Sequence, residues 1–566
     1  MRDWTAPMMA TDTMTACIFY HPDAYTTTGP RLMGRNAAGE SFLAGFLTHS
    51  HATEFWVQVQ KPDHADGFKE AVARRRPGAA VTVVERANLR DLETPGIVYH
   101  PGPTISEHAF LRSIAGAASG DAAWSLCGVT HTTASAAAMD ALTALITAPV
   151  QPWDAVICTS AAVKDNVVRL LEAQVEYLRD RLGVQRTVLP QLPVIPLGLH
   201  SQDFAIPDTA KAAARSSLGV DPDTIVVLFL GRLSFHAKAH PLAMYQALER
   251  AARASGKNVV LVECGWHGND VIAQAFAEAA GIACPSVRVV TLDGRDAEAR
   301  RTSWAAADVF CSLVDNIQET FGIAPIEAMA AGLPVVVSDW DGYRDTVRDG
   351  IDGFRIPTVM PRAGLAGDLA ARHALDGNYD MYCGYTSSLI AIDVEAAASA
   401  FEKLFRSPEL RRRMGEAGQG RVREVYDWAR IIPQYEALWA ELAEIRRAQP
   451  RRGTGLEHPW PARLDPFHAF ARYPTHTLGR QTVLALADAD AASALARVRA
   501  YRGLMMVKYA ALVFPSDAEI EAILALAATG PMTADALVRT GAPGRQPFLL
   551  RGLAWLMKLG VLKLAA

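Results

Sequence analysis

Cysteine is scarce in this sequence and shows no regular spacing. The 566 residues include seven cysteines, none of which forms a Cys-x-x-Cys pair. Scattered thiols in odd number favour a reducing compartment over a disulfide framework or a zinc site. Two of them, Cys158 and Cys311, lie in apolar runs, where a thiol packs as a small hydrophobe. The histidines lack metal-ligand spacing and no convincing Asp-x-Asp loop is present, so no metal site is predicted.

Net charge and long apolar runs are also lacking. The 56 Lys and Arg residues against 60 Asp and Glu leave a net charge of −4, whereas proteins that bind nucleic acids usually carry a strongly basic domain. No run approaches the roughly 18 apolar residues that span a membrane, and residues 1–20 lack the pattern of a signal peptide. We therefore expect a cytoplasmic protein with no nucleic-acid partner. Basic runs at 74–76, 411–413 and 446–452 leave a peripheral membrane contact open.

The chain does contain a repeated alternation of short apolar strands and amphipathic helices. Most of the strands are uninterrupted apolar runs, as expected for parallel strands covered on both faces. The pattern predicts an α/β fold with two doubly wound, Rossmann-like domains. The expected strands are 16–20, 55–59, 81–85, 97–100, 124–129, 155–159 and 194–197 in the first domain, and 225–230, 259–263, 287–292, 309–313 and 335–338 in the second.

Two polar segments set the expected domain boundaries. Residues 201–207 separate the two alternating halves, and residues 449–455, rich in turn formers and charge, follow a helical region. We predict domains at 1–200, 201–448 and 456–566, the second ending in a helix that returns toward the first. The third is expected to be mostly helical, and its helix–turn–helix–strand pattern at 534–540, 546–559 and 561–564 resembles a winged-helix module. Because the segment 548–557 is too apolar to read bases, we expect a protein-contact or dimer surface there.

The stretch from residue 308 to 337 carries the strongest chemical signal. A buried strand leads into a loop, and a helix is expected to begin near Pro325, a residue suited to a first helical turn, and to end near Gly332. Backbone N–H groups at a helix start favour an anion. We expect the backbone N–H groups of Thr320, Phe321 and Gly322 to bind an anion in this way.

Two carboxylates, Glu319 and Glu327, stand on either side of that turn. Carboxylates hold hydroxyl groups through charge-assisted hydrogen bonds, although a single Glu near a helix start is usually a solvated residue that favours the helix dipole. The whole string resembles the Glu-x7-Glu signature of retaining GT-B glycosyltransferases, most closely glycosyltransferase family 4 (glycosyl transferases group 1). The resemblance implies that Glu319 contacts hydroxyls of a donor sugar and Glu327 those of a nucleotide ribose. It also implies that the amides after Glu319 meet the sugar and its phosphate.

A cationic loop follows the first strand of the second domain. Gly231, Arg232 and Lys238 lie just past residues 225–230, at the strand end where phosphates bind in such sheets. Two cations there can neutralise the charge on a leaving diphosphate without a metal. The loop resembles the family's Gly-Arg-Leu…Lys segment, which implies a diphosphate clamp. Ala239 stands where the family commonly has glycine.

The first domain offers weaker signals. His131 follows the strand at 124–129, and the family commonly has a histidine there, which implies a role in positioning the donor. Asn36 and Gly39 lie near the start of the first long helix. They resemble the family's glycine-rich loop beneath the diphosphate, but the usual adjacent glycine pair is absent.

The combined prediction is a metal-independent, retaining glycosyltransferase that needs no cofactor beyond its nucleotide diphosphate sugar. The resemblance implies that residues 201–448 bind this donor and that residues 1–200 face an unidentified acceptor, which is a glycan, a lipid-linked molecule or a small molecule. Two alternatives stay open: a GT-B nucleotide-sugar epimerase or phosphorylase, and a non-enzymatic scaffold or DNA-binding protein that acts through residues 456–566. Oligomerisation through that last domain also stays open.

Overall fold

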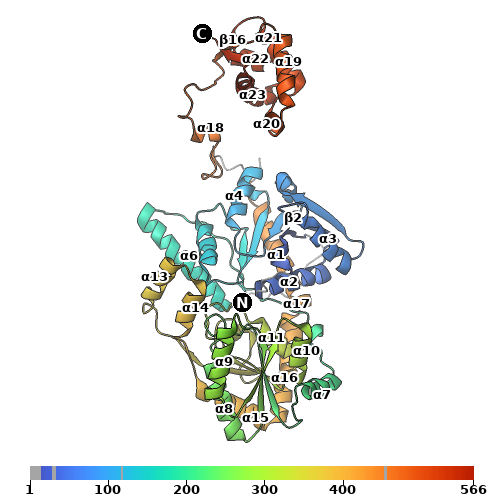
Figure 1. Ribbon diagram of the computed structural model, residues 1–566, viewed down its shortest axis with the longest axis vertical. Helices are drawn as coiled ribbons and strands as arrows, with labels where there is room; N and C mark the ends of the chain where they lie inside the picture. The colour runs from blue at the N-terminus through green and yellow to red at the C-terminus, as the bar shows by residue number, and fades with distance from the viewer. Residues whose placement is uncertain (1–14, 28–33, 117–118, 451–455, 566) are drawn as a thin grey trace. The chain divides into compact units, whose positions relative to one another are not determined.

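The computed structural model describes residues 15–27, 34–116, 119–450 and 456–565. The chain forms two compact units, Met1–Trp460 and Pro461–Ala566. The first unit contains two successive six-stranded parallel sheets, each with helices packed on both faces (Figure 1). The predicted α/β fold with two Rossmann-like domains and a mostly helical C-terminal part is confirmed. Among the described residues, no helix combines the length and the apolar character that crossing a membrane requires.

The first sheet has the strand order β3-β2-β1-β4-β5-β6, so that the chain crosses over at β1. Successive residues of β1 point to opposite faces: Cys17 lies in the core on one side and Ile18 in the core on the other. The strands are β1 (Cys17–Tyr20), β2 (Glu54–Val59), β3 (Ala80–Glu85), β4 (Ile97–Tyr99), β5 (Ser125–Val129) and β6 (Ala155–Ile157). The helices are α1 (Pro22–Tyr25), α2 (Gly34–His49), α3 (His64–Arg75), α4 (Ser106–Ala115), α5 (Ala136–Thr143) and α6 (Ala161–Leu182).

The predicted seventh strand, at residues 194–197, is wrong. Within that segment, Val194 forms an isolated bridge with Cys158, the residue after β6. Prolines at 190, 193 and 196 explain the difference, because proline has no N–H to donate to a ladder of hydrogen bonds. The segment therefore has the apolar composition of a strand but lacks the N–H groups that a strand needs for its hydrogen bonds.

The second sheet has the order β12-β11-β10-β7-β8-β9, which places β10 beside β7. The edge strand β12 was not predicted, because Gly353 and Arg355 interrupt its apolar pattern. The strands are β7 (Ile225–Leu230), β8 (Val259–Gly265), β9 (Arg288–Asp293), β10 (Val309–Ser312), β11 (Val335–Ser338) and β12 (Gly353–Ile356). The helices are α7 (Asp208–Ser217), α8 (Leu242–Ser255), α9 (Asp270–Ala283), α10 (Ala297–Ala306), α11 (Ile323–Ala330), α12 (Tyr343–Thr346), α15 (Val394–Arg406) and α16 (Pro408–Arg421).

A helical pair that the sequence did not predict lies between two short antiparallel strands of the second domain. The strands are β13 (Thr358–Val359) and β14 (Ala391–Ile392). The helices between them are α13 (Gly367–Asp376) and α14 (Tyr379–Ser387).

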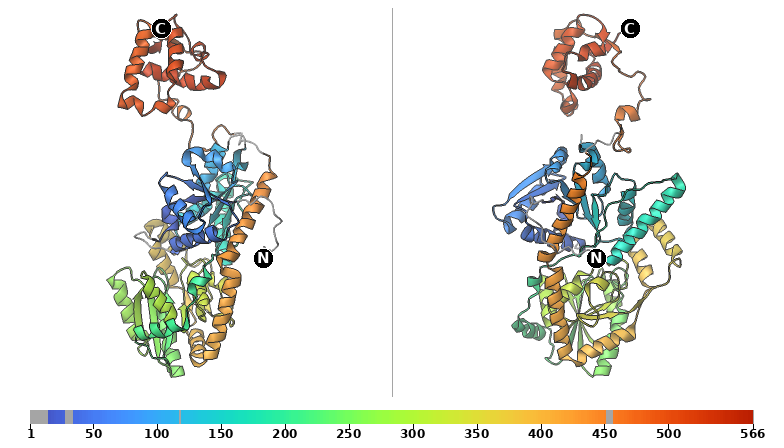
Figure 2. Two further views of the ribbon diagram at one scale, coloured as in Figure 1. Left: turned by 90° about the vertical axis from the view of Figure 1, so that its right-hand side faces the viewer. Right: turned by 180° about the vertical axis from the view of Figure 1, so that it is seen from behind.

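The last helix of the first unit, α17 (Trp428–Arg447), returns from the second domain to the first (Figure 2). At the crossing, the N–H of Trp428 donates to the carbonyl of Leu199, whose own N–H donates to the carbonyl of Tyr426. The Trp428 indole N–H also donates to Ser41 Oγ on α2, at 2.8 Å. Trp439, farther along α17, is fully buried in the same first-domain core. The returning helix predicted at the end of residues 201–448 is therefore part of the core of the first domain.

One fully buried ion pair, between Arg112 and Asp154, ties α4 to the segment before β6. Two hydrogen bonds of 2.6 and 2.8 Å join the guanidinium to the carboxylate. Arg112 also donates to the carbonyl of Trp124, and Asp154 accepts from the N–H of Leu126. The two side chains therefore neutralise each other's charge and also form hydrogen bonds with backbone groups around β5.

We expect Arg112→Met to lower the free energy of unfolding by about 3–5 kcal/mol, because it leaves a buried carboxylate without its counter-charge. Denaturant unfolding of the purified protein measures this. Arg372→Met, at a largely exposed ion pair on α13, serves as the control and should change stability by less than about 1 kcal/mol. Equal effects of the two substitutions would contradict the structural role of the Arg112–Asp154 pair.

The second unit has a small antiparallel sheet with the order β16-β15-β17. Its strands are β15 (Val483–Leu486), β16 (Met532–Thr533) and β17 (Leu562–Leu564), and its helices are α18 (Pro466–Ala469), α19 (Ala491–Arg502), α20 (Met505–Lys508), α21 (Asp517–Ala527), α22 (Ala534–Val538) and α23 (Gln546–Lys558). The predicted helix–turn–helix–strand run is present as α22, α23 and β17. Leu549, Leu553 and Leu556 of α23 are fully buried in the core of this unit. The core of this unit thus accounts for these leucines, and the expected protein-contact or dimer surface at 548–557 stays a prediction.

Candidate functional site

The centre of the candidate site is an ion pair between Lys238 and Glu319. Lys238 lies on the loop after β7 and Glu319 on the loop after the neighbouring strand β10. Lys238 Nζ is 2.6 Å from Glu319 Oε2, and the two side chains are 22% and 11% exposed. The structure thus brings together two residues that the sequence analysis assigned to the same site from separate motifs.

Glu319 also binds the backbone that follows it. Its carboxylate accepts a hydrogen bond from the N–H of Thr320, at 3.2 Å, and the backbone of Phe321 also lowers its pKa. Burial alone would raise the pKa of Glu319, but the charge of Lys238 and these hydrogen bonds outweigh burial and hold the pKa below its usual range. One of the three amides predicted to meet a donor, that of Thr320, therefore holds a carboxylate in this structure.

The turn before α11 is fixed by close packing at Gly322. Its φ of 88° lies in the left-handed region, and a Cβ at this position would come within 2.0 Å of the Tyr343 ring. The Tyr343 hydroxyl is 2.9 Å from Ser312 Oγ at the end of β10. Only glycine fits here, so Tyr343 holds the predicted anion-binding turn in one shape.

The loop that carries Arg232 and Lys238 folds back on itself. Arg232 Nη2 donates to the carbonyl of Ala237 at 2.6 Å, and Asn316 Nδ2 donates to the carbonyl of His236 at 3.1 Å. At the loop's start, Gly231 is so close to β8 that a Cβ on Gly265 would lie 1.9 Å from the Gly231 carbonyl oxygen. The guanidinium and the ammonium predicted to clamp a diphosphate are therefore on one tightly held loop.

Glu327 has a different environment from Glu319. It lies on α11 and is partly buried, and burial raises its pKa to about 7 although the positive charge of Arg300 on α10 opposes the shift. Arg300 itself donates to the carbonyl of Gly294 in the loop after β9. The two predicted carboxylates therefore face different cations, which is consistent with different roles.

Hydrogen bonds join the second domain to the first at several points. Thr320 Oγ1 donates to the carbonyl of His131 at 3.3 Å, and Ser160 Oγ lies 3.3 Å from Asp341 Oδ1. The N–H of Ala161, at the start of α6, donates to an Asp345 carboxylate oxygen at 2.7 Å. These residues follow β5, β6, β10 and β11, so the carboxyl ends of both sheets face one boundary, where α/β sheets bind ligands. His131 meets the site through its backbone, and its predicted role in positioning a donor stays a prediction.

Asn36 and Gly39 have structural partners in the first domain. Asn36 Nδ2 donates to the carbonyl of Asp23 on α1, and a Cβ on Gly39 would lie 2.0 Å from the Ala24 carbonyl oxygen. The close packing of α1 on α2 accounts for both residues. Their predicted place beneath a diphosphate stays a prediction, and residues 28–33 just before them lie outside the described segments.

Sequence reasoning missed Asp341, which follows β11. It is the one non-glycine residue of the described chain with positive φ, at 42°. Burial, together with the negative charge of Glu319, raises its pKa to about 8. The Asp-Gly dipeptide after an apolar run is a turn signal that points to this residue.

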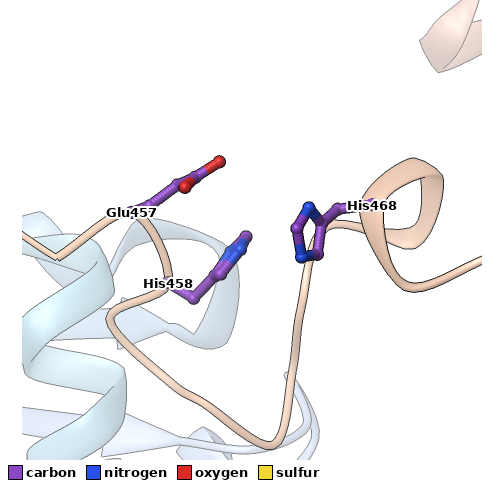
Figure 3. Close-up of side chains that lie close together, drawn as sticks. All are labelled: Glu457, His458 and His468. Atoms are coloured by element: carbon purple, nitrogen blue, oxygen red, sulfur yellow. The ribbon is translucent and has the colours of Figure 1, made fainter. Parts of the chain in front are cut away.

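The described residues contain one group of three potential metal ligands: Glu457, His458 and His468 (Figure 3). Glu457 and His458 belong to the first unit and His468 to the second. Because the group is divided between the two units, we assign no metal site to it.

Two buried histidines lie side by side in the first domain. The ring centroids of His100 and His108 are 3.9 Å apart, and burial lowers the pKa of both residues, that of His108 to about 4.

Comparison with known proteins finds a family match within the second domain. Residues 210–365, which include both candidate cations and both candidate carboxylates, match the family described as Glycosyl transferases group 1. A D-inositol 3-phosphate glycosyltransferase of Mycobacterium sp. (strain KMS) is 35% identical over 167 residues, 29% of this chain and 35% of the relative. A phosphatidyl-myo-inositol mannosyltransferase of Mycobacterium leprae (strain TN) is 34% identical over 149 residues, 26% of this chain and 30% of the relative. The chain thus spans about a third of the length of these curated relatives.

Solved structures resemble a larger part of the chain at lower identity. The crystal structure of Anabaena Alr3699/HepE in complex with UDP has 15% identity and a TM-score of 0.48, over 75% of this chain and 100% of that chain. Sucrose-phosphate synthase (tll1590) from Thermosynechococcus elongatus has 18% identity and a TM-score of 0.44, over 76% and 99%. The family match and the curated relatives support glycosyl transfer as the reaction class.

Proposed function

We propose that this protein is a retaining glycosyltransferase of family 4 that transfers a sugar from a nucleotide diphosphate sugar to a hydroxylated acceptor in the cytoplasm. The observation that carries the proposal is the Lys238–Glu319 pair at the carboxyl ends of β7 and β10, inside the group 1 domain. Cations at that position suit a diphosphate, and a carboxylate beside them suits sugar hydroxyls.

In the proposed reaction, Lys238 and Arg232 bind the diphosphate as it becomes the leaving group. Its negative charge grows while the glycosidic bond breaks, and preorganised cations stabilise that charge most in the transition state. In the structure, Glu319 is the counter-ion of Lys238. Donor binding therefore exchanges one anionic partner of Lys238 for another and leaves Glu319 to accept hydrogen bonds from the donor sugar.

Glu327 is proposed to bind the ribose, and the first domain to bind the acceptor. The curated relatives are named for inositol phosphate and phosphatidyl-myo-inositol, so we propose a polyol or polyol phosphate as the acceptor class. D-inositol 3-phosphate is the first compound to test. No residue assigned to the reaction requires a metal ion.

The proposal is tested by a thermal-shift screen of UDP-, GDP- and ADP-sugars, because a bound ligand raises the melting temperature according to its affinity. The best donor is then incubated with D-inositol 3-phosphate and with water alone, and the products are followed by proton NMR. Release of the nucleotide with an α-linked first product from an α-linked donor supports a retaining transferase. A β-linked product excludes retention, an isomerised donor indicates an epimerase, and the absence of any shift or turnover rejects a nucleotide-sugar enzyme.

The raised pKa of Glu327 predicts that donor affinity depends on pH. A carboxylate accepts ribose hydrogen bonds more strongly than a carboxylic acid, so the affinity should rise as pH increases through about 7. We expect the Kd for the best nucleotide sugar to fall about threefold to tenfold between pH 6 and pH 8. Isothermal titration calorimetry measures it. Glu327→Gln should flatten this dependence, and an unchanged slope in that variant would contradict the ribose role.

A further inference from the structure

The second unit exposes a cluster of apolar side chains that its own core does not bury. Residues 504–513, which include α20, carry six large apolar side chains that are between 45% and 92% exposed. They are Leu504, Met505, Met506, Tyr509, Leu512 and Val513. Single exposed apolar residues are ordinary, whereas an apolar patch of several neighbours marks a site of interaction. We call residues 504–513 the apolar loop.

Two side chains anchor the apolar loop to the core of the second unit. Val507 and Phe514 pack against that core, and the rings of Phe514 and Trp555 are stacked with their centroids 4.2 Å apart. Between the anchors the backbone forms hydrogen-bonded turns, in which the N–H of Tyr509 donates to the carbonyl of Met505. A backbone that pairs its own polar groups enters an apolar environment at a lower cost than an unpaired one.

The charge around the apolar loop is of one sign. Residues 491–516 contain three arginines and one lysine, Lys508, but no Asp or Glu. The arginines pair with carboxylates outside this stretch: Arg497 with Asp488, Arg499 with Glu521, and Arg502 with Asp517. Lys508 lies within the loop and forms no ion pair with any residue that the structure describes. The loop therefore presents an unneutralised ammonium among exposed apolar side chains.

We propose that the apolar loop is a peripheral membrane-binding surface, which inserts its apolar side chains into an anionic lipid surface and holds Lys508 at the headgroups. The long lysine stem lets the ammonium stay in the headgroup layer while its apolar neighbours are buried. Tyr509, with an apolar ring and a polar hydroxyl, suits the same boundary. None of these residues lies in the group 1 domain, so this surface is separate from the proposed transfer site.

A second copy of this chain fits the apolar loop less well than a lipid surface. A two-fold dimer places the same surface on both sides of the interface, which brings the two Lys508 side chains toward each other. The stretch 491–516 offers no carboxylate to neutralise them. An anionic lipid surface attracts that charge and also covers the apolar side chains.

Sedimentation of the full-length protein with lipid vesicles tests the proposal. Vesicles of phosphatidylcholine with about one third phosphatidylglycerol supply the anionic surface, and vesicles of phosphatidylcholine alone are the neutral comparison. We expect wild type to bind the anionic vesicles more tightly. Leu512→Glu and Met505→Glu should each weaken that binding about tenfold or more, because each places a charge where an apolar side chain enters the lipid. Lys508→Gln should weaken it about fivefold at low salt, and added salt should remove this difference.

Ile282→Glu is the matched control, because Ile282 is a 76% exposed apolar residue on α9 of the first unit. It should bind vesicles as tightly as wild type. Turnover of a nucleotide sugar in water should be unchanged in Leu512→Glu, so that a failure of membrane binding and a failure of the proposed glycosyl transfer can be told apart. Thermal melting checks that each variant is folded, and Met505→Glu gives the answer if Leu512→Glu is not.

Four results overturn the proposal. The first is a wild type that binds neither kind of vesicle, and the second is equal binding by Leu512→Glu and Ile282→Glu. The third is a dimer in analytical ultracentrifugation that Leu512→Glu dissociates, which assigns the apolar loop to a second copy. The fourth is an expansion of lipid-free Leu512→Glu relative to wild type in small-angle scattering, which assigns the loop to a contact with the first unit.

Discussion

Lys238→Ala is expected to lower turnover about 10²–10³-fold, the loss seen when one preorganised donor is removed from a site that stabilises developing negative charge. The Lys238 side chain is 22% exposed and its ammonium lies 2.6 Å from Glu319 Oε2, so the ion pair holds the ammonium in place. Its removal takes away a charge at the leaving group and also leaves Glu319 without its counter-ion. Steady-state release of the nucleoside diphosphate from the best donor measures the loss, and full activity would rule out the assigned role.

Arg232→Lys provides the companion measurement. The planar guanidinium can bind two phosphate oxygens at once, whereas an ammonium acts as a point charge, so this variant should also be impaired. Because both cations act on one diphosphate, the double variant Arg232→Lys with Lys238→Ala should lose less than the product of the single losses. EDTA should leave the wild type unaffected. Strong inhibition by EDTA that magnesium or manganese reverses would replace the metal-free clamp with a metal site.

Glu319→Gln is expected to separate binding from turnover. The carboxylate accepts a hydrogen bond from the Lys238 ammonium, so its neutralisation frees the ammonium for a diphosphate. We expect the free nucleoside diphosphate to bind as tightly as in wild type or more tightly. Turnover should fall about 10–100-fold, because the donor sugar loses a charged hydrogen-bond partner worth roughly 1.5–3 kcal/mol. Calorimetry measures the affinity for the nucleoside diphosphate, and initial rates on the same preparation measure turnover.

Glu327→Gln is the matched control for this variant. It is the same substitution eight positions along the chain, on α11, where the nearby cation is Arg300. It should weaken nucleotide binding and affect turnover at saturating donor much less. If the two variants show the same pattern, the separate roles of the two carboxylates are wrong.

The two sheets and several site residues were predictable from the sequence because their signals are local. A strand covered on both faces must be apolar throughout, so β7 and β10 are uninterrupted apolar runs. The anion-binding turn also has a local signal, since Gly322 and the helix that follows it are contiguous. The same reasoning failed for residues 194–197, where composition suggested a strand but regularly spaced prolines prevent a ladder of hydrogen bonds.

The sequence by itself determined the α/β architecture, and it predicted the residue types of the candidate site, which are two carboxylates and two cations after apolar strands. Only the tertiary structure decided their partners. Lys238 and Glu319 are 81 positions apart and meet because β7 and β10 are neighbours in the sheet, and α17 joins the first-domain core from the far end of the unit. Such long-range contacts come from the summed burial of many side chains on different elements, and no short segment encodes that sum.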